Sequence, residues 1–259
     1  LLEMDIRSPE AARVIIDRRP DAVCHHAAQM SVSRSVADPA FDASVNVMGS
    51  LNLLEAARRA GARFVFASTG GALYGDAAVL PTPETEPAWP LSPYGVGKLS
   101  VEHYLHFYGV EHGLPYVALR YANVYGPRQN PHGEAGVVAI FCRALFQGRP
   151  PVVNGDGTNT RDYVYVADVV DANLRALSAS LSGHFNVGTG LQTDVNDLLA
   201  MIAGSAGLAA DGRHGPPRPG EQRTSALDPA LIAGALGWGP GVPLAEGIAR
   251  TVDWFRGRA

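Results

Sequence analysis

The sequence predicts an α/β protein built on a doubly wound parallel sheet, with a smaller α/β part toward the C-terminus. Two observations lead to this prediction. Short apolar segments alternate with helical segments of ten or more residues, which is the pattern of parallel strands joined by crossover helices. Apolar residues make up 46 % of the 259 residues and charged residues 18 %, as in globular proteins with a sizeable core.

The alternation is clearest in the first half of the chain. In order, we expect a helix over 9–19, a strand over 21–27, one long amphipathic helix over 37–61, a strand over 63–68, a helix over 94–112 and a strand over 115–124. The long helix ends at Gly61, a residue suited to the position after a helix terminus. Residues 70–92 are rich in glycine and proline without a regular period, which indicates a loop.

The second half continues the pattern with shorter strands. We expect helices over 136–148, 167–180, 194–205, 228–236 and 244–257, and strands over 151–155, 162–166 and 184–188. The Pro/Gly-rich stretch 212–220 is expected to form a loop.

Charge and cysteine content exclude several classes of protein. A net charge of −4 and a pI of about 6.1 argue against a nucleic-acid partner or a polybasic membrane patch. No apolar run approaches the roughly 18 residues of a membrane-spanning helix, so we expect no membrane partner. Cys24 and Cys142 stand in apolar contexts and are expected to be buried thiols in a reducing cytoplasm.

Lys98 is the only lysine, although lysine and arginine together number 21. It follows Tyr94 by four residues in a helical segment that Ser92 and Pro93 begin, so both side chains share a face. A tyrosine that acts as a base near neutrality needs its pKa lowered by roughly 3 units. A nearby ammonium group favours the phenolate, and arginine is not equivalent there. We interpret Tyr94 and Lys98 as a catalytic pair; a surface tyrosine and a solvated lysine at chance spacing are the alternative.

Hydroxyl groups follow the strand expected over 63–68. Ser68 and Thr69 end it, and Gly70 and Gly71 come next. Hydroxyls at the carboxyl end of such a strand face the crevice where α/β sheets bind ligands. A turn that merely ends the strand is the alternative.

Histidines do not indicate a metal site. His103 and His106 lie on the same helix as Tyr94, but their spacing with Glu102 does not match zinc-protease motifs. We expect no metal, and assign these histidines to solvent or subunit contacts. His25 and His26 point to opposite faces of a strand, so one of them is expected in the core.

A series of motifs then occurs in order along the chain. These are DIR (5–7), HHAAQ (25–29), NVMGS (46–50), STGGALYG (68–75), SPYGVGK (92–98), RYANVYGPRQ (120–129), NGDGTNTRDYVYVADVVDA (154–172), FNVGTG (185–190) and RPGEQR (218–223). Together they resemble the extended short-chain dehydrogenase/reductases, in particular NAD-dependent epimerases/dehydratases of the UDP-galactose 4-epimerase type. The resemblance implies a Rossmann-like sheet, an NAD cofactor and a UDP-sugar substrate.

The resemblance also implies roles for residues that match the family's motifs. For NAD these are Asp5, Ile6, His26, Ala27, Ala28, Gln29, Asn46, Tyr94, Lys98 and Tyr121. For the nucleotide sugar they are Tyr74, Asn123, Arg161, Arg218, Arg223 and Ser225. Tyr94 would be the base, Lys98 would hold the nicotinamide ribose, and Thr69 would hydrogen-bond the sugar 4-oxygen. Ser68 stays open as the catalytic hydroxyl, because the segment from Thr69 to Tyr74 is one residue longer than in some relatives.

Gly70 and Gly71 favour an epimerase within this family. Dehydratases need a positioned acid/base pair, which in relatives follows the threonine directly. Glycine carries no such group, so we expect 4-epimerisation of UDP-glucose and UDP-galactose, with the N-acetylhexosamine forms admitted by the small Ser225. UDP-glucuronate 4-epimerisation, another dehydratase or reductase activity, and a non-catalytic dinucleotide-binding module remain alternatives.

The resemblance extends to domains, assembly and the start of the chain. Residues 1–126 and about 151–182 would bind NAD, and about 127–150 and 183–259 the nucleotide sugar. Helices near 40–60 and 94–112 would form a homodimer in the cytoplasm. The family's first strand–helix–strand unit, roughly 50 residues with a glycine-rich turn, is missing. We expect either a preceding segment outside this sequence, or a truncated protein that retains NAD poorly and exposes a sheet edge.

Overall fold

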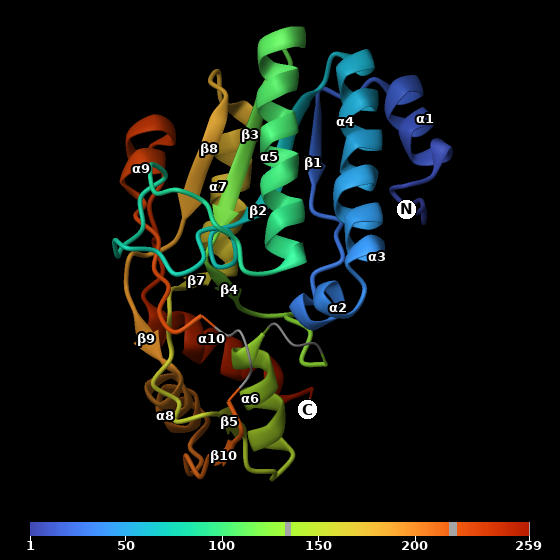
Figure 1. Cartoon of the computed structure of the whole chain (residues 1–259). Helices are drawn as coiled ribbons and strands as arrows, with labels where there is room; N and C mark the ends of the chain where they lie inside the picture. The colour runs from blue at the N-terminus through green and yellow to red at the C-terminus, as the bar shows by residue number, and fades with distance from the viewer. Residues whose placement is uncertain (133–135, 218–221, 259) are drawn as a thin grey trace. The chain divides into compact units, whose positions relative to one another are not determined.

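The computed structural model describes residues 1–132, 136–217 and 222–258 (Figure 1). The chain forms two compact units. The first consists of Leu1–Gly75, Pro87–Arg120 and Ala172–Phe185, and the second of Asp76–Glu86, Tyr121–Asp171 and Asn186–Ala259. Both units are interleaved along the chain, and residues 151–171 lie in the second unit, because their strands pair with strands of that unit. The ligand assigned to each part stays a prediction.

A four-stranded sheet organises the first unit. Its strands, in spatial order, are β1 (Ala22–His25), β2 (Arg63–Thr69), β3 (Tyr116–Tyr121) and β8 (Gly183–Val187). β1 and β2 run parallel with Ala22 opposite Arg63 and His25 opposite Phe66. Two parallel neighbours separated by helices require a crossover connection, so the predicted parallel α/β architecture is confirmed.

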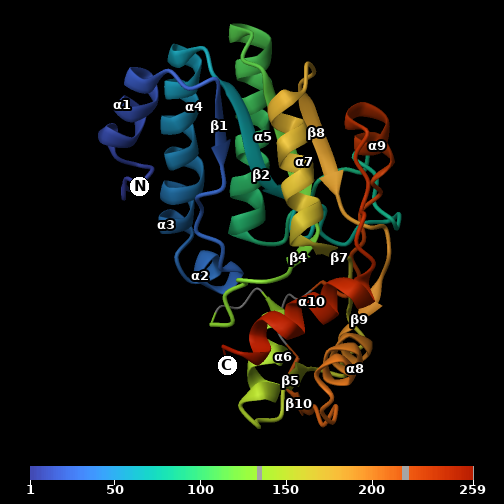
Figure 2. The same cartoon turned by 180° about the vertical axis from the view of Figure 1, so that it is seen from behind.

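Helices cover both faces of this sheet. They are α1 (Pro9–Arg18), α2 (Val32–Ala37), α3 (Pro39–Ala43), the π-helical segment η1 (Ser44–Met48), α4 (Gly49–Ala60), α5 (Pro93–His112) and the end of α7 (Val166–Ser178). Figure 1 shows α4 and α5 in front of the sheet, and Figure 2 shows α7 on its opposite face. Leu54, Phe64, Phe66 and Leu105 are fully buried between α4, α5 and the strands.

The prediction of one continuous α-helix over 37–61 is wrong. α3, η1 and α4 follow one another, and α2 precedes them with its own cap, in which the Ser31 side chain accepts from the Arg34 N–H. The π-helical turn carries Asn46, whose side-chain bonds are described below, and single-turn π-helices are frequent at functional sites. The predicted end is confirmed: Gly61 adopts φ 71° and caps α4.

The described part of the second unit contains short strand pairs and further helices. β4 (Asn123–Tyr125) pairs with β7 (Tyr163–Tyr165), β5 (Val152–Asn154) with β10 (Arg213–Gly215), and β6 (Thr160–Arg161) with β9 (Thr193–Asp194). The helices are α6 (Val137–Phe146), α8 (Val195–Ala206), α9 (Ala230–Leu236) and α10 (Leu244–Arg256). The strand predicted over 115–124 is therefore divided between two sheets, with β3 in one and β4 in another.

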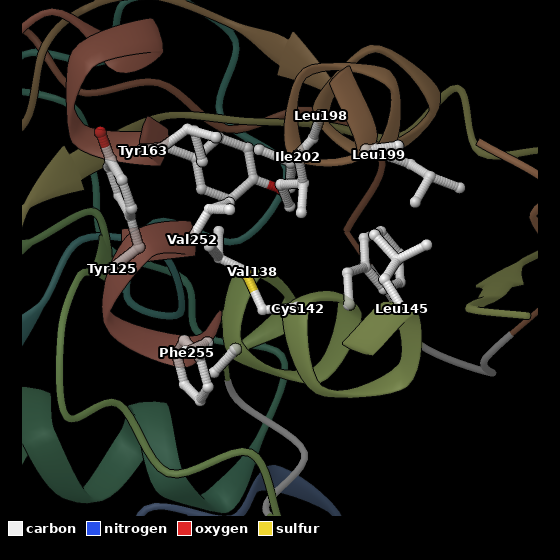
Figure 3. Packing of buried hydrophobic residues seen from close by; sticks show 14 of the residues in the cluster. Tyr125, Val138, Cys142, Leu145, Tyr163, Leu198, Leu199, Ile202, Val252 and Phe255 are labelled. Atoms are coloured by element: carbon white, nitrogen blue, oxygen red, sulfur yellow. The ribbon is translucent and has the colours of Figure 1, made fainter. Parts of the chain in front are cut away.

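α6, α8 and α10 build the core of the second unit. Figure 3 shows Val138 and Cys142 of α6 close to Ile202 of α8 and to Val252 and Phe255 of α10, and all five are buried. An apolar interior packed this way holds the unit together by removing hydrocarbon surface from water. Cys142 is thus buried as expected.

Cys24 is exposed, which corrects the prediction that both thiols are buried. Cys24 is exposed because it lies on β1, the end strand of the four-stranded sheet, which has a neighbouring strand on one side only within the described residues. His25, the next residue, is buried against Phe64 and Phe66, whereas His26 is exposed, as expected for opposite faces of a strand. None of the helices within the described ranges is long and apolar enough to cross a membrane.

Candidate active site

Lys98 lies inside the first unit, where α5 meets the carboxyl end of β2. Ser92 caps the helix by accepting from the Gly95 N–H at 3.2 Å, so the first turn places Tyr94 and Lys98 on one face. The Lys98 side chain is only 4 % exposed. Its ammonium donates to the Ala67 carbonyl at 2.8 Å and lies 4.6 Å from the Phe66 ring centroid and 5.9 Å from that of Tyr94. The alternative of a solvated surface lysine is therefore wrong.

The Lys98 ammonium is incompletely satisfied. An ammonium group has three N–H donors, and one of them goes to Ala67. Within the described ranges, the other two have no hydrogen-bond partner. Burial lowers the pKa of Lys98 to about 8, against the opposing effect of Asp42 and Glu102. A buried cation with two donors to spare fits the hydroxyl groups of a ribose, as the expected NAD site requires.

Tyr94 is a phenol in its protonated form in this structure. Burial, aided by the Asp42 carboxylate, raises its pKa to about 12. Its hydroxyl makes no hydrogen bond with any described residue. The expected lowering by Lys98 is therefore absent here, because desolvation of the phenolate and a nearby negative charge outweigh the ammonium. For Tyr94 to act as a base, its pKa must fall, which requires further positive charge or a polar substrate beside the hydroxyl.

Asp42 is a residue of this site that the sequence did not reveal. It lies on α3 and is 1 % exposed. One carboxylate oxygen, Oδ1, accepts from Gln29 Nε2 at 2.8 Å and from Asn46 Nδ2 at 3.0 Å. The other, Oδ2, is buried with no hydrogen-bond partner among the described residues. A Cβ added to Gly97 would lie 3.5 Å from this oxygen, so Asp42 faces the helical turn that joins Tyr94 to Lys98.

Asn46 braces the loop after β1. Its side chain accepts from the Gln29 backbone N–H at 2.9 Å and donates to the Gln29 carbonyl at 2.9 Å. This paired contact fixes the backbone of the segment that also contains Ala27 and Ala28, two small residues without bulk toward a ligand. The geometry agrees with the expected cofactor loop, although its role in binding NAD stays a prediction.

Two other residues expected near the cofactor, His26 and Asp5, lie outside the helices and strands. His26 Nε2 lies 3.2 Å from Asn173 Oδ1 and 3.2 Å from Cys24 Sγ, and burial lowers its pKa. Asp5 is exposed and paired with Arg7 at 2.5 Å, whose guanidinium lowers the Asp5 pKa to about 2. Its carboxylate is therefore a charged acceptor across the physiological pH range.

The two hydroxyls at the end of β2 differ in their hydrogen bonds. Ser68 is buried and donates to a Glu102 carboxylate oxygen at 2.5 Å. Thr69 is partly exposed, and its hydroxyl makes no hydrogen bond with the described residues. Because Lys98 reaches the Ala67 carbonyl two residues earlier, Thr69 ends the same strand edge that the lysine contacts. This arrangement favours Thr69 over Ser68 as the hydroxyl that meets a substrate.

Residues expected to bind the nucleotide sugar belong to the second unit, except Tyr74, which is buried in the first. Asn123 begins β4, and the Arg161 guanidinium on β6 donates to the Thr160 carbonyl at 2.7 Å. Arg223 is exposed and Ser225 is buried. Tyr121, which was expected to contact NAD, is the last residue of β3. Arg218 lies outside the described residues, so its placement is not assigned.

Comparison with known proteins identifies the relatives of this chain. Residues 1–188 match the model of the NAD dependent epimerase/dehydratase family. A UDP-glucose 4-epimerase of Mycolicibacterium smegmatis is 48 % identical over 260 residues, which cover 100 % of this chain and 83 % of the relative.

Two solved structures extend the comparison to the fold. The Thermotoga maritima UDP-glucose 4-epimerase with UDP-glucose has 48 % identity and a TM-score of 0.96, covering 99 % of this chain and 84 % of its own. The Thermus thermophilus UDP-glucose 4-epimerase complexed with NAD has 46 % identity and a TM-score of 0.93, with the same coverage.

Proposed function

The chain belongs to the NAD-dependent epimerase/dehydratase family, and on this basis we propose that it interconverts the C4 epimers of a UDP-sugar. The substrates are UDP-glucose and UDP-galactose, and the reaction passes through a transient 4-keto sugar. The high identity to two UDP-glucose 4-epimerase structures supports this assignment. The observation that carries it within the site is a pair of groups on α5, the half-buried Tyr94 and the buried Lys98, near a strand end whose hydroxyl, Thr69, has no partner in the described chain.

Each of these residues has one chemical task. Thr69 hydrogen-bonds the 4-oxygen of the sugar, and Tyr94 removes the 4-hydroxyl proton and later returns it. When bound, NAD would supply the acceptor and donor for the C4 hydride and a positive charge that favours the Tyr94 phenolate. Lys98 would hold the ribose hydroxyls with its two spare N–H groups. Together with the positive charge of the cofactor, its ammonium would favour the phenolate form of Tyr94.

Gly70 and Gly71 support epimerisation over the dehydratase reactions of the same family. A dehydratase must move protons at C5 and C6 and needs an acid/base pair beside the sugar. The two residues after Thr69 carry no side chain that could do so. The small Ser225 supports acceptance of N-acetylhexosamines as a second substrate class.

The test is a panel of nucleotide sugars. The protein is incubated with NAD and UDP-glucose, UDP-N-acetylglucosamine or UDP-glucuronate, and products are identified by proton NMR. We expect the 4-epimer of UDP-glucose, with Tyr94→Phe inactive. If no 4-epimer forms from any of the three, the proposal fails; if Tyr94→Phe leaves the measured function unchanged, a non-catalytic dinucleotide-binding role replaces it.

We further propose that the protein is a homodimer formed by α4 and α5. A surface groove of about 590 Å³ lies between these helices, with Met48, Leu51, Tyr104 and Phe107 in its lining. Met48, Phe107 and the neighbouring Val110 are large, exposed apolar side chains, and an apolar surface of this kind is typical of an interface.

Light scattering after gel filtration tests the dimer. We expect twice the 27.3 kDa chain mass, and the monomer mass for Phe107→Arg. Leu231 on α9 is as exposed as Phe107, so Leu231→Arg is the matched control and should remain dimeric. A wild-type monomer would overturn the proposal.

The free Cys24 and Cys142 support a cytoplasmic location, which cell fractionation tests.

A further inference from the structure

Four polar side chains form a buried cluster at the carboxyl end of β2. They are Ser68 on β2, Tyr74 in the following loop, Glu102 on α5 and Arg120 on β3. Each is less than 8 % exposed, and all four belong to the first unit. Glu102 and Arg120 take no part in the proton transfer proposed for Tyr94.

Arg120 and Glu102 hold this cluster together. The guanidinium Nε lies 3.1 Å from both Glu102 carboxylate oxygens, and Nη2 donates to one of them at 2.6 Å. Nη1 donates to the Tyr74 hydroxyl at 2.7 Å, and Glu102 accepts from Ser68 at 2.5 Å. Burial alone would lower the Arg120 pKa, but the adjacent Glu102 raises it, so the guanidinium stays charged.

The cluster makes hydrogen bonds at both ends of the loop that follows β2. Ser68 precedes Thr69, and Tyr74 follows Gly71, the second of the two glycines, by three residues. The two glycines offer no side chain that could anchor the loop from within. A buried ion pair is a weak source of stability, because desolvation offsets the attraction, but its directional bonds fix geometry.

We propose that the Glu102–Arg120 ion pair is the positioning device of the active-site loop: through Ser68 and Tyr74 it holds the segment that presents Thr69 and the glycine pair to the sugar. The proposal rests on the proposed function for the identity of the sugar. It makes Glu102 and Arg120 positioning residues, and it makes Ser68 a structural donor rather than the catalytic hydroxyl.

The first experiment separates positioning from stability. Glu102→Met/Arg120→Met replaces the pair by apolar side chains of similar length, which often leaves stability unchanged, so we expect a melting temperature within about 4 °C of the wild type. The turnover number kcat should fall about 10- to 100-fold, as a misplaced reacting group causes, while KM for the UDP-sugar changes less than about 3-fold.

Single variants and a control complete this series. Arg120→Lys keeps the charge but loses the planar fork, so it should not restore turnover. Glu246→Gln removes the carboxylate of an exposed Glu–Arg pair on α10 and should behave as the wild type. If the double variant folds and turns over at the wild-type rate, the positioning role is overturned.

A second readout does not depend on turnover. With 3-fluorotyrosine at position 74, the fluorine resonance should show little difference between H₂O and D₂O in the wild type, because Tyr74 is 3 % exposed. Glu102→Gln and the double variant should increase this solvent effect and broaden the line, while Glu246→Gln should not. A protected, narrow resonance in every variant would overturn the positioning role, whether or not the wild type forms a 4-epimer. Failure of the wild type to form a 4-epimer would refute only the proposed function.

Discussion

At the scale of single residues, the lone lysine is the clearest signal that the sequence contained. Its spacing from Tyr94 predicted a shared helix face, and the structure places the Lys98 ammonium in a buried position with a single carbonyl partner among the described residues. The electrostatic balance was not predictable, because Asp42 is distant in sequence and acts through space. Tyr94 is therefore a weaker acid in this structure than its partnership with Lys98 suggested.

Lys98→Arg should lower kcat at least about 100-fold with the fold intact, because the guanidinium is too broad to make the same contacts from a buried helix face. Steady-state kinetics with UDP-galactose and a thermal melt measure both parts. Near-normal turnover would mean that the isolation of this lysine has no functional cause.

Asp42→Asn should move the pH dependence of kcat/KM to lower pH. The carboxylate raises the pKa of both Tyr94 and Lys98, so its removal lowers both. The base then loses its proton at lower pH, and Lys98 becomes neutral at lower pH, so both limbs of the profile move the same way. We expect about one pH unit, the smaller end of the effect of a nearby charge. Asparagine keeps a side-chain oxygen that can accept from Gln29 and Asn46. A shift of the profile toward higher pH would contradict this account.

Ser68→Ala and Thr69→Ala form a matched pair that assigns the catalytic hydroxyl. Because Ser68 donates to Glu102 and Thr69 has no partner in the described chain, Thr69→Ala should reduce kcat about 100-fold and Ser68→Ala about 10-fold or less. Initial rates at saturating UDP-sugar measure the difference. The reverse order would identify Ser68 as the catalytic group.

At the scale of elements, helix α5 shows what periodicity can and cannot predict. Its start was readable from Ser92 and Pro93, and the structure confirms both. The helix predicted over 37–61 failed, because hydrophobic spacing does not reveal that Asn46 turns away to bind the Gln29 backbone and that a π-helical turn forms around it. The Glu102–Arg120 pair was equally invisible, since two polar residues 18 positions apart carry no local signal.

Two glycines of α5 allow a controlled test of its packing. A Cβ on Gly95 would lie 2.4 Å from the Ala72 carbonyl oxygen, whereas one on Gly97 would lie 3.5 Å from its nearest neighbour. Gly95→Ala should therefore destabilise the protein by about 1–3 kcal/mol and impair turnover through the loop after β2. Gly97→Ala should be tolerated, with a gain of up to about 1 kcal/mol from helix propensity. Urea unfolding of both variants measures this, and equal stabilities would contradict it.

At the scale of the whole molecule, composition and alternation predicted the α/β architecture, and the comparisons confirm it. The pairing of the short strands could not be predicted from the sequence, because strands as short as β5 and β7 do not reveal their partners there. The residues expected to bind the nucleotide sugar lie mostly in the second unit, and Tyr94 and Lys98 lie in the first. Their roles rest on the proposed function and on the experiments given with it.

The most direct test of the account is the fate of hydrogen at C4, C5 and C6 of the sugar. UDP-galactose is incubated with the protein and NAD in D₂O, and the product is examined by NMR. The account predicts UDP-glucose with the 6-hydroxyl intact and without deuterium at C4 or C5, because no acid/base group at residues 70 and 71 acts on C5. Deuterium at C5, or a 4-keto-6-deoxy product, would contradict it.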